Sequence, residues 1–365
     1  MAKLITVSIR FEIPEALRRR HRQTARGRLW LGDVRGFIEQ ALEQWQLELA
    51  LPPHGLPWHG HTGVVVPVVT AQGVQAALKV VFPHEEALLE PLALTLWNGS
   101  GSVRLLANDD SLGAMLLERL DEQRSLMELP MEEAIPLWGG VVQELSIHPD
   151  DRPEWRLLPH IAATAERYSD ELPQAWTDLG EPFPRWLLEA ALEVCHTRGA
   201  VGRRSSNDVL VHTDLHYQNI LARPGSGQPG SGQPGSGQPG SGQPGSGQPG
   251  SGQPRSGQYL AIDPQVQVGD GEFAVAPCLW NRLEDLPALN AAAGLRRRAA
   301  ALAQAAGLDE ELCAQWAVLR EVENALSYFA DSLPDDAKRS LWVASTMAGR
   351  TLPGLPDAHA LHRLY

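Results

Sequence analysis

The stretch His212–Asn219, HTDLHYQN, places an aspartate and an asparagine five residues apart, directly after a short apolar β-strand pattern. Farther along the chain, the apolar segment 259–262, YLAI, ends at Asp263. Two carboxylates and an amide oxygen at strand ends are the groups that phosphoryl transfer requires. One carboxylate orients and deprotonates a hydroxyl, and the others hold Mg²⁺ on the phosphates. The spacing HxDxxxxN around Asp214 and Asn219 is that of a kinase catalytic loop.

A lysine upstream fits the same chemistry. Lys79 lies within residues 74–82, VQAALKVVF, the second strand of a predicted hairpin. The next segment, 84–97, is predicted as a helix despite the proline inside it. A strand lysine paired with a glutamate on the following helix would hold the α and β phosphates of a nucleotide. Which glutamate of that segment is the partner stays open at this point.

The remaining pattern divides the chain into a β-rich part and a helical part. Helical spacing of apolar residues predicts a helix from Val34 to Leu49, and residues 102–121 predict a second hairpin. After that hairpin helices predominate, including three at the C-terminal end. We therefore expect an α+β, bilobal fold with a β-rich N-terminal lobe over 1–121 and a helical C-terminal lobe over 122–365.

A low-complexity segment interrupts the helical lobe. Six copies of Gly-Ser-Gly-Gln-Pro run from Gly225 to Pro254, within an insertion that we place at 224–258. These residues bury almost no apolar surface, so a flexible, linker-like loop is expected. The flanking segments NILA and YLAI can still pair as a hairpin, because closure costs only about 0.6 kcal/mol more for each doubling of loop length. Loss of that pairing would separate Asn219 from Asp263.

Charge and cysteine content narrow the function classes. A net charge of −13 argues against nucleic acid as a partner and favours cationic ligands. The arginines between Arg18 and Arg28 are expected to form a solvated helix face. Cys195, Cys278 and Cys313 are far apart in the sequence, and no run of 18 apolar residues occurs in it. We expect reduced, mostly buried thiols in a cytoplasmic protein without a membrane segment.

Longer motifs around these residues resemble a known family. HTDLHYQNIL and LAIDPQVQVGDGEFAVAPCLWNRL together resemble the paired motifs of the aminoglycoside/hydroxyurea antibiotic resistance kinases, the streptomycin 6-kinase group of aminoglycoside phosphotransferases. HTGVVVPV, ALKVV, HEEALLEPLALTLW and MLLERL resemble that group's N-terminal lobe in the same order. The resemblance runs from about Gly32 to the C-terminus, apart from the insertion.

The resemblance implies a protein-kinase-like fold that uses ATP and Mg²⁺. The implied activity is transfer of the γ-phosphoryl group to a hydroxyl of an antibiotic, with a cationic aminoglycoside such as streptomycin as the small-molecule substrate. Hydroxyurea or another small hydroxylated metabolite is the alternative acceptor. Residue by residue, Asp214 corresponds to the catalytic base, Asn219 and Asp263 to the metal ligands, and Lys79 with Glu90 to the site for the α and β phosphates. Glu86 is a close competitor of Glu90 as the partner of Lys79, because both would lie on one helical face.

The resemblance also implies two backbone segments that meet the nucleotide. Gly60, Thr62 and Gly63, in the segment WHGHTG, correspond to a loop near the phosphates. Leu116–Leu120, which includes Glu118, corresponds to the hinge whose backbone meets adenine.

The sequence departs from the family pattern at two points. Thr213 stands where a glycine usually precedes the catalytic aspartate, and DPQ at 263–265 stands where protein kinases have DFG. Because of Thr213 and the insertion, a catalytically silent nucleotide-binding homologue remains an alternative. His212 is expected to support the loop and His216 to pack beside it. A third alternative is a metal-dependent hydrolase, because alternate residues His212, Asp214 and His216 on a strand would point to one side.

The predicted C-terminal helices carry five acidic residues that could form a cleft floor attracting a polycation. They are Glu321, Glu323, Asp331, Asp335 and Asp336. An ordinary solvated acidic surface is the alternative interpretation of the same residues.

Overall fold

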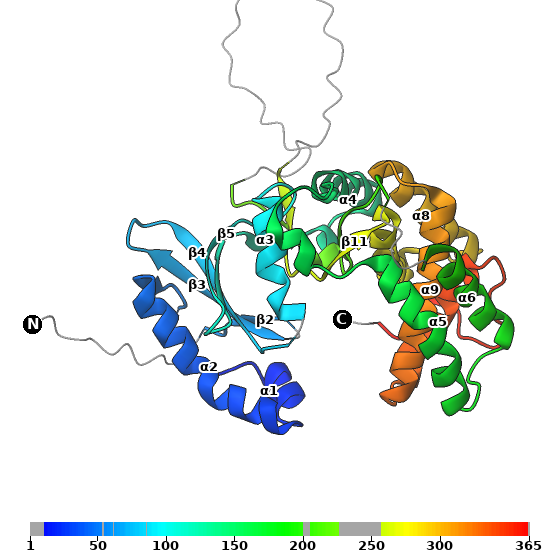
Figure 1. Cartoon of the computed structure of the whole chain (residues 1–365), viewed down its shortest axis with the longest axis horizontal. Coiled ribbons are helices and arrows are strands. Elements are labelled where there is room, and N and C mark those ends of the chain that lie inside the picture. Colours follow the sequence, from blue (N-terminus) through cyan, green and yellow to red (C-terminus); the bar gives the residue numbers. More distant parts are fainter. Residues whose placement is uncertain are drawn as a thin grey trace, which may run out of the picture.

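The N-terminal lobe is built on a six-stranded antiparallel sheet (Figure 1), with strand order β1-β3-β4-β6-β5 and β2 paired with β3. The strands are β1 (Leu47–Leu49), β2 (Trp58–His59), β3 (Gly63–Thr70), β4 (Gln75–Val81), β5 (Leu105–Asp109) and β6 (Ala114–Glu118). Both predicted hairpins, β3–β4 and β5–β6, are confirmed. The computed structural model describes residues 11–52, 55–60, 62–84, 86–199, 205–225 and 257–363.

Two helices cover one face of this sheet, α1 (Glu15–His21) and α2 (Ala25–Gln44). Trp30, Val34 and Ile38 of α2 are buried in one cluster with the valines of β3. The prediction of a helix as far as Leu49 is wrong at its end. The left-handed backbone of Gln46 (φ 51°) ends the helical path, and the next three residues pair with β3 as β1. The arginines between Arg18 and Arg28 are exposed, as predicted.

Helix α3 (Glu90–Trp97) lies between the sheet and the helical lobe, after the 3-10 turn η1 (Glu86–Leu88). It begins later than the sequence pattern predicts. Pro91 therefore lies in the first turn of the helix, where a missing N–H leaves no hydrogen bond unmade. Leu94 and Trp97 are buried against the side of the sheet opposite α2.

Two small sheets join the lobes, and the motifs HTDLHYQN and LAIDPQ lie at the ends of their strands. One is β10 (Tyr259–Ala261), β9 (Ile220–Ala222) and β7 (Asp121–Ser125), in that order, and the other pairs β11 (Val266–Gly269) with β8 (Val209–His212). The antiparallel pairing of β9 with β10 confirms the hairpin predicted across the insertion. The predicted flexible loop itself lies outside the described residues over 226–256. The lobe boundary proposed after residue 121 falls inside β7.

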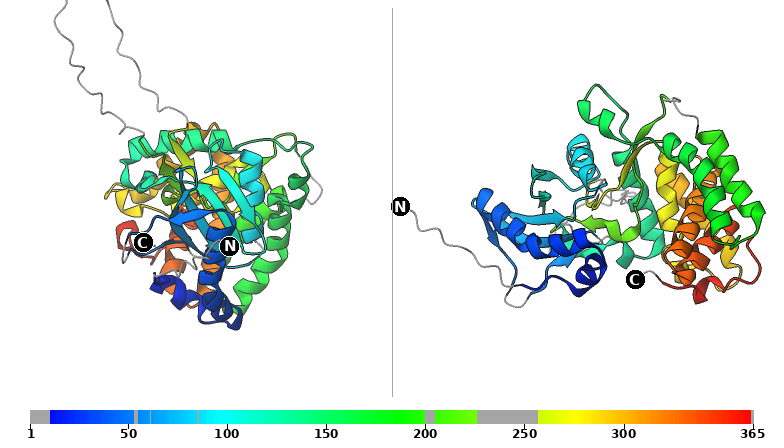
Figure 2. Two further views of the ribbon diagram at one scale, coloured as in Figure 1. Left: turned by 90° about the vertical axis from the view of Figure 1, so that its left-hand side faces the viewer. Right: turned by 60° about the horizontal axis from the view of Figure 1, so that its bottom comes forward.

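The C-terminal lobe is mainly helical, and Figure 2 shows it at the opposite end of the molecule from the first sheet. Its helices are α4 (Met131–Leu145), α5 (Ile161–Asp178), α6 (Arg185–Arg198), α7 (Ala276–Leu279), α8 (Ala291–Ala306), α9 (Glu310–Ala330) and α10 (Pro334–Met347). The last three match the predicted C-terminal helices. Short 3-10 turns connect them: η2 (Leu126–Glu128), η3 (Pro153–Leu157), η4 (Tyr217–Asn219), η5 (Gly271–Val275), η6 (Leu283–Asp285) and η7 (Ala358–Ala360).

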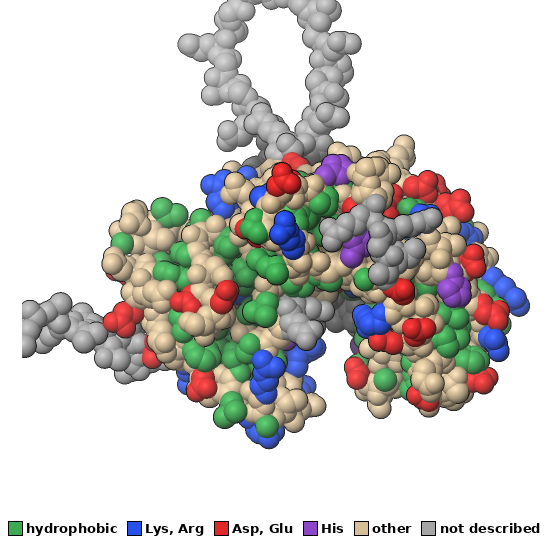
Figure 3. Space-filling model, in the orientation of Figure 1, with side chains coloured by type: hydrophobic (Ala, Val, Ile, Leu, Met, Phe, Trp, Pro, Cys, Tyr) green, Lys and Arg blue, Asp and Glu red, His purple; other side chains and the backbone are tan. Residues whose placement is uncertain are grey.

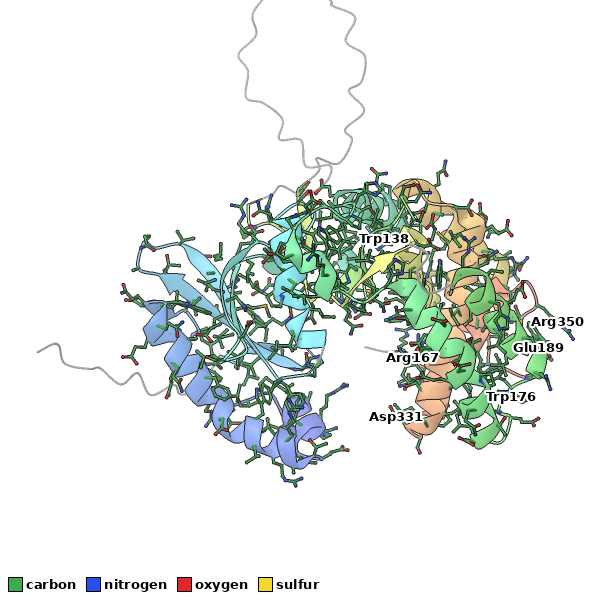
Figure 4. All side chains as sticks on the ribbon, viewed as in Figure 1. Trp138, Arg167, Trp176, Glu189, Asp331 and Arg350 are labelled. Carbon is green, nitrogen blue, oxygen red and sulfur yellow. The ribbon has the colours of Figure 1, made fainter. Side chains whose placement is uncertain are left out.

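The core of this lobe runs from the small sheets to the last helices. Trp138 of α4, labelled in Figure 4, is fully buried and donates from Nε1 to the carbonyl of Leu215 in the catalytic loop. Cys195, Cys278 and Cys313 are buried free thiols, as predicted. Within the described ranges, every helix is too short or too polar to cross a lipid bilayer.

Candidate active site

A cavity of about 630 Å³ opens where the two lobes meet. Lys79 and Glu90 line it from the N-terminal lobe, and Asp214, Asn219 and Asp263 line it from the small sheets. The structure therefore brings together five side chains that lie far apart in the sequence. Figure 3 shows the molecule hollowed between the lobes, with Lys and Arg gathered over α1 and more Asp and Glu on the facing helical lobe.

Apolar side chains form two walls of this cavity. Val65 and Ala77 line it from the first sheet, and Leu221 and Ile262 line it from the β9–β10 hairpin. Val65 is the register partner of Lys79, so the apolar wall and the lysine belong to the same part of the sheet. A slot between two such walls can take a flat heterocycle. Sequence reasoning did not single out these residues.

Lys79 is the centre of an ion cluster. Its Nζ donates to both carboxylate oxygens of Glu90, at 2.7 and 2.6 Å, and also contacts Oδ1 of Asp263. Burial lowers the pKa of Lys79, but the carboxylates of Asp263 and Glu90 more than offset it, so the pKa lies above its ordinary value. Lys79 is therefore protonated at neutral pH. Glu90 is the helix partner, while the side chain of Glu86 lies outside the described part of the structure.

The backbone around Asp263 brings its carboxylate close to the β2–β3 turn. Asp263 has a left-handed φ of 57°, and a Cβ placed on Gly60 would lie 3.1 Å from its Oδ2. Gly60 therefore leaves room for the carboxylate, and it lines the cavity. Thr62 and Gly63 are not among the described residues lining it. Thr62 accepts a backbone hydrogen bond from Phe82, at 2.7 Å, and the Gly63 backbone packs on β4. Their contact with a phosphate stays a prediction.

His212 ties the catalytic loop to the strand that leads to Asp263. Its Nδ1 accepts from the backbone N–H of Asp214 at 3.2 Å, and its Nε2 donates to the carbonyl of Ile262 at 3.1 Å. Burial lowers the pKa of His212 to about 4, so the ring is neutral with one donor and one acceptor. Both nitrogens are thus occupied, which removes a ligand from the hydrolase alternative. Among the described residues no group of three His, Cys, Asp or Glu could hold a metal ion.

Asp214 and Asn219 occupy the loop that follows. The side chain of Asp214 is 28% exposed and lines the cavity. Asn219 is buried, and its Nδ2 donates to the carbonyl of Asp214 at 2.9 Å, which leaves Oδ1 as its side-chain acceptor. Oxygen atoms of Asn219 and Asp263 on one cavity wall fit Mg²⁺. This ion prefers oxygen ligands and takes only one or two from protein when phosphates supply the others.

Thr213 fits the structure of this loop. Its backbone N–H and its hydroxyl both donate to the carbonyl of Gln265, at 2.7 and 3.3 Å. Its own carbonyl accepts from Nη1 of Arg320 on α9, at 2.7 Å. The side chain that replaces the usual glycine is therefore buried and hydrogen-bonded between β8 and β11.

The segment predicted as a hinge runs along the cavity edge. Glu118, at the end of β6, lines the cavity, and its Oε1 accepts from the backbone N–H of Arg104 at 3.0 Å. The guanidinium of Arg119 stacks on the ring of Trp58, 4.2 Å from its centroid, and both residues line the cavity. The contact of this segment with adenine stays a prediction. Trp58 and His59 form a strand, where the sequence pattern indicated a turn.

The acidic residues of the C-terminal helices differ in burial and in pairing. Glu321 is fully buried in α9, and burial raises its pKa to about 7. At the start of α10, Asp335 pairs with Lys338 and Asp336 pairs with Arg339, and both pairs lie within this helix. Asp331, labelled in Figure 4, lies at the lower end of α9. The expectation of a cleft floor is therefore wrong for Glu321.

Three comparisons with known proteins agree with this geometry. A family model described as aminoglycoside/hydroxyurea antibiotic resistance kinase matches residues 48–331. Streptomycin 6-kinase of Streptomyces griseus is 31% identical over 327 residues, covering 88% of this chain and 92% of the relative. Hydroxyurea phosphotransferase of Kitasatospora aureofaciens is 32% identical over 331 residues, covering 89% and 82%.

Among solved structures, a GDP complex of a mutant aminoglycoside 2'-phosphotransferase-IIIa superposes with a TM-score of 0.50 at 12% identity. The superposition covers 86% of this chain and 97% of that one. At this identity the likeness concerns the fold alone, and it agrees with the expected α+β, bilobal, protein-kinase-like architecture.

Proposed function

Because the chain belongs to the aminoglycoside/hydroxyurea antibiotic resistance kinase family, we propose that it transfers the γ-phosphoryl group of ATP to a hydroxyl of a streptomycin-type aminoglycoside. The observation that carries this proposal is the convergence of Lys79, Glu90, Asp214, Asn219 and Asp263 on one cavity between the lobes. Such transfer needs positioning and charge stabilisation more than covalent chemistry.

Each of these side chains has a separate task towards the nucleotide. The adenine enters the slot between Val65 and Leu221, and Lys79 contacts the α and β phosphates while Glu90 holds its ammonium group in place. Asn219 and Asp263 would hold Mg²⁺, which when bound neutralises phosphate charge. Because Lys79 now contacts Asp263, arrival of the phosphates exchanges part of that ion pair for new partners.

Asp214 acts on the acceptor. Its carboxylate accepts the proton of the acceptor hydroxyl as that oxygen bonds to the γ-phosphorus. The bond between the γ-phosphorus and the bridging oxygen of the β phosphate then breaks, and ADP leaves. The backbone N–H of Asp214 donates to His212 Nδ1, and Asn219 Nδ2 donates to the Asp214 carbonyl, so the loop is fixed and the carboxylate is in place before the substrates bind.

The named relatives and the net charge of the chain support the choice of acceptor. The net charge of −13 favours a cationic acceptor, and the Streptomyces griseus relative is named for streptomycin. A second candidate is hydroxyurea, because the Kitasatospora aureofaciens relative is 32% identical. Three buried free thiols support a reducing, cytoplasmic setting.

The test is a panel of acceptors with purified protein and MgATP, scored by the mass gain of one phosphate. Streptomycin, other aminoglycosides, a viomycin-like peptide and hydroxyurea form the panel. Phosphorylated streptomycin is the expected product. A product from hydroxyurea alone would replace the aminoglycoside proposal. ATP binding without any phosphorylated product would favour the catalytically silent homologue.

A further inference from the structure

Arg223 closes the base of the hairpin from which the insertion leaves. It follows β9 directly, and its backbone N–H donates to the carbonyl of Gln258 at 2.9 Å. Its side-chain Nη1 donates to the carbonyl of Gly257 at 3.0 Å, on the opposite leg. One residue earlier, Ala222 is in register with Tyr259. The two legs are therefore joined by backbone and side chain before the repeat begins.

The same side chain contacts a residue that lines the cavity. Nη2 of Arg223 lies 3.6 Å from Oε1 of Glu118, the oxygen that also accepts from the backbone of Arg104. Glu118 lines the cavity, and the next strand, β7, pairs with β9 at Asp121 and Ala222. The hairpin and the predicted hinge are thus connected both by strand pairing and by one ion pair.

We propose that Arg223 is a positioning residue for the nucleotide, locking the hairpin that links Asn219 to Asp263 onto Glu118 at the cavity edge. Asn219 immediately precedes β9, and Asp263 is the second residue after the end of β10. A closed hairpin base therefore keeps the two expected metal ligands in register whatever the length of the repeat. The consequence for ATP rests on the function proposed above, whereas the consequence for backbone order does not.

The length of the loop determines how much Arg223 contributes to closing the β9–β10 hairpin. Arg223 and Glu118 are 37% and 25% exposed, so their ion pair alone is modest. Closing a hairpin costs more conformational entropy with a long loop than with a loop of three residues. The contribution of Arg223 should therefore shrink when the loop is shortened.

The first experiment compares Arg223→Ala with the full chain. The expected result is a KM for MgATP raised about threefold to fivefold, with kcat and the acceptor KM changed less than twofold. Arg223→Lys keeps the charge and should give an intermediate KM. Arg185→Ala, which removes an exposed pair with Glu189 within α6, is the matched control and should leave all constants unchanged. An unchanged KM for MgATP in Arg223→Ala would overturn the proposal.

The second experiment deletes residues 226–256 and joins Gly225 to Gly257. The deletion alone should leave turnover unaltered. Arg223→Ala in the shortened chain should raise the KM for MgATP by less than half as much as it does in the full chain. An equal effect of Arg223→Ala in both backgrounds would refute the link between the lock and loop length.

A third measurement does not depend on activity. Amide hydrogen exchange over β7, β9 and β10 should be faster in Arg223→Ala and unchanged in Arg185→Ala. Equal exchange in Arg223→Ala and the parent protein would contradict the positioning role. Failure of the proposed function would instead appear as a parent protein without turnover, and the exchange comparison would stand in either case.

Discussion

Two buried glutamates, one in each lobe, illustrate how the two lobes differ. Glu90, on α3 beside the nucleotide cavity, is 5% exposed and binds the ammonium group of Lys79 with both oxygens. Glu321, on α9 in the helical lobe, is fully buried, and its Oε1 accepts from the neutral amide of Asn324 at 2.9 Å. The Glu90 carboxylate has a positively charged partner at hydrogen-bond distance. The Glu321 carboxylate has a neutral amide at that distance instead.

The comparison shows when the position of a charged side chain can be predicted from the sequence. Strand pairing fixes Lys79 between β3 and β6, so a glutamate at the start of the next helix meets it on the same side of the cavity. No comparable constraint turned the acidic residues of the C-terminal helices toward one surface. Charged residues on the nucleotide side should therefore control binding and turnover, whereas Glu321 should control stability alone.

The largest effect is expected from Lys79→Met. This variant leaves Glu90 buried without its counter-charge, which should lower the free energy of unfolding by about 3–5 kcal/mol. Urea denaturation measures this loss. Adding Glu90→Gln should recover part of it, because the uncompensated charge is then gone. Equal stability of Lys79→Met and the parent protein would contradict the role given to this pair.

Asp263→Ala should affect function more than folding. Loss of this expected metal ligand should reduce turnover by on the order of a hundredfold to a thousandfold and weaken MgATP binding with it. Calorimetric titration with MgATP and steady-state kinetics measure the two effects. Asp335→Ala, which removes an exposed carboxylate paired within α10, is the matched control. Retained Mg²⁺-dependent binding in Asp263→Ala would contradict the assignment.

Glu321→Gln should give the smallest effect, with the opposite sign. Burial raises the pKa of Glu321 to about 7, above its ordinary value of 4.5, so the folded state holds the extra proton between these pH values. Stability from this group is present below pH 4.5 and is lost as pH rises to 7. Glu321→Gln should therefore match the parent protein near pH 4.5 and exceed it by up to about 3 kcal/mol at pH 8.

Denaturation midpoints of the parent protein and Glu321→Gln at the two pH values make this test. Asn324, the amide partner of Glu321, can still bond a glutamine oxygen, so the variant keeps the local packing. A difference that is the same at both pH values would exclude titration of Glu321 as its source.

Sequence reasoning predicted the site where spacing and chain order restrict the geometry. Asp214 and Asn219 lie on one loop after a buried strand, and the β9–β10 pairing brings Asp263 back beside them despite the insertion. The hairpin around Lys79 was predictable from two apolar, β-rich runs separated by a turn at Gln72–Gly73.

Other features depended on local backbone or tertiary contacts. The left-handed Gln46 ends a helix whose apolar spacing continues past it. Pro91 looked like a defect within a helix, although the helix begins one residue before it. The lock made by Arg223 could not be predicted, because its partners Gly257 and Glu118 are distant from it in the sequence.

The most direct test of the central claim is a comparison of Asp214→Ala with the parent protein in two assays, MgATP binding by calorimetry and phosphate transfer to streptomycin by mass. Asp214 lines the cavity, while the groups assigned to the nucleotide are Lys79, Asn219 and Asp263. The predicted result is an ATP affinity close to that of the parent protein with transfer reduced to background. Unchanged transfer by Asp214→Ala would contradict the catalytic role of the HTDLHYQN loop.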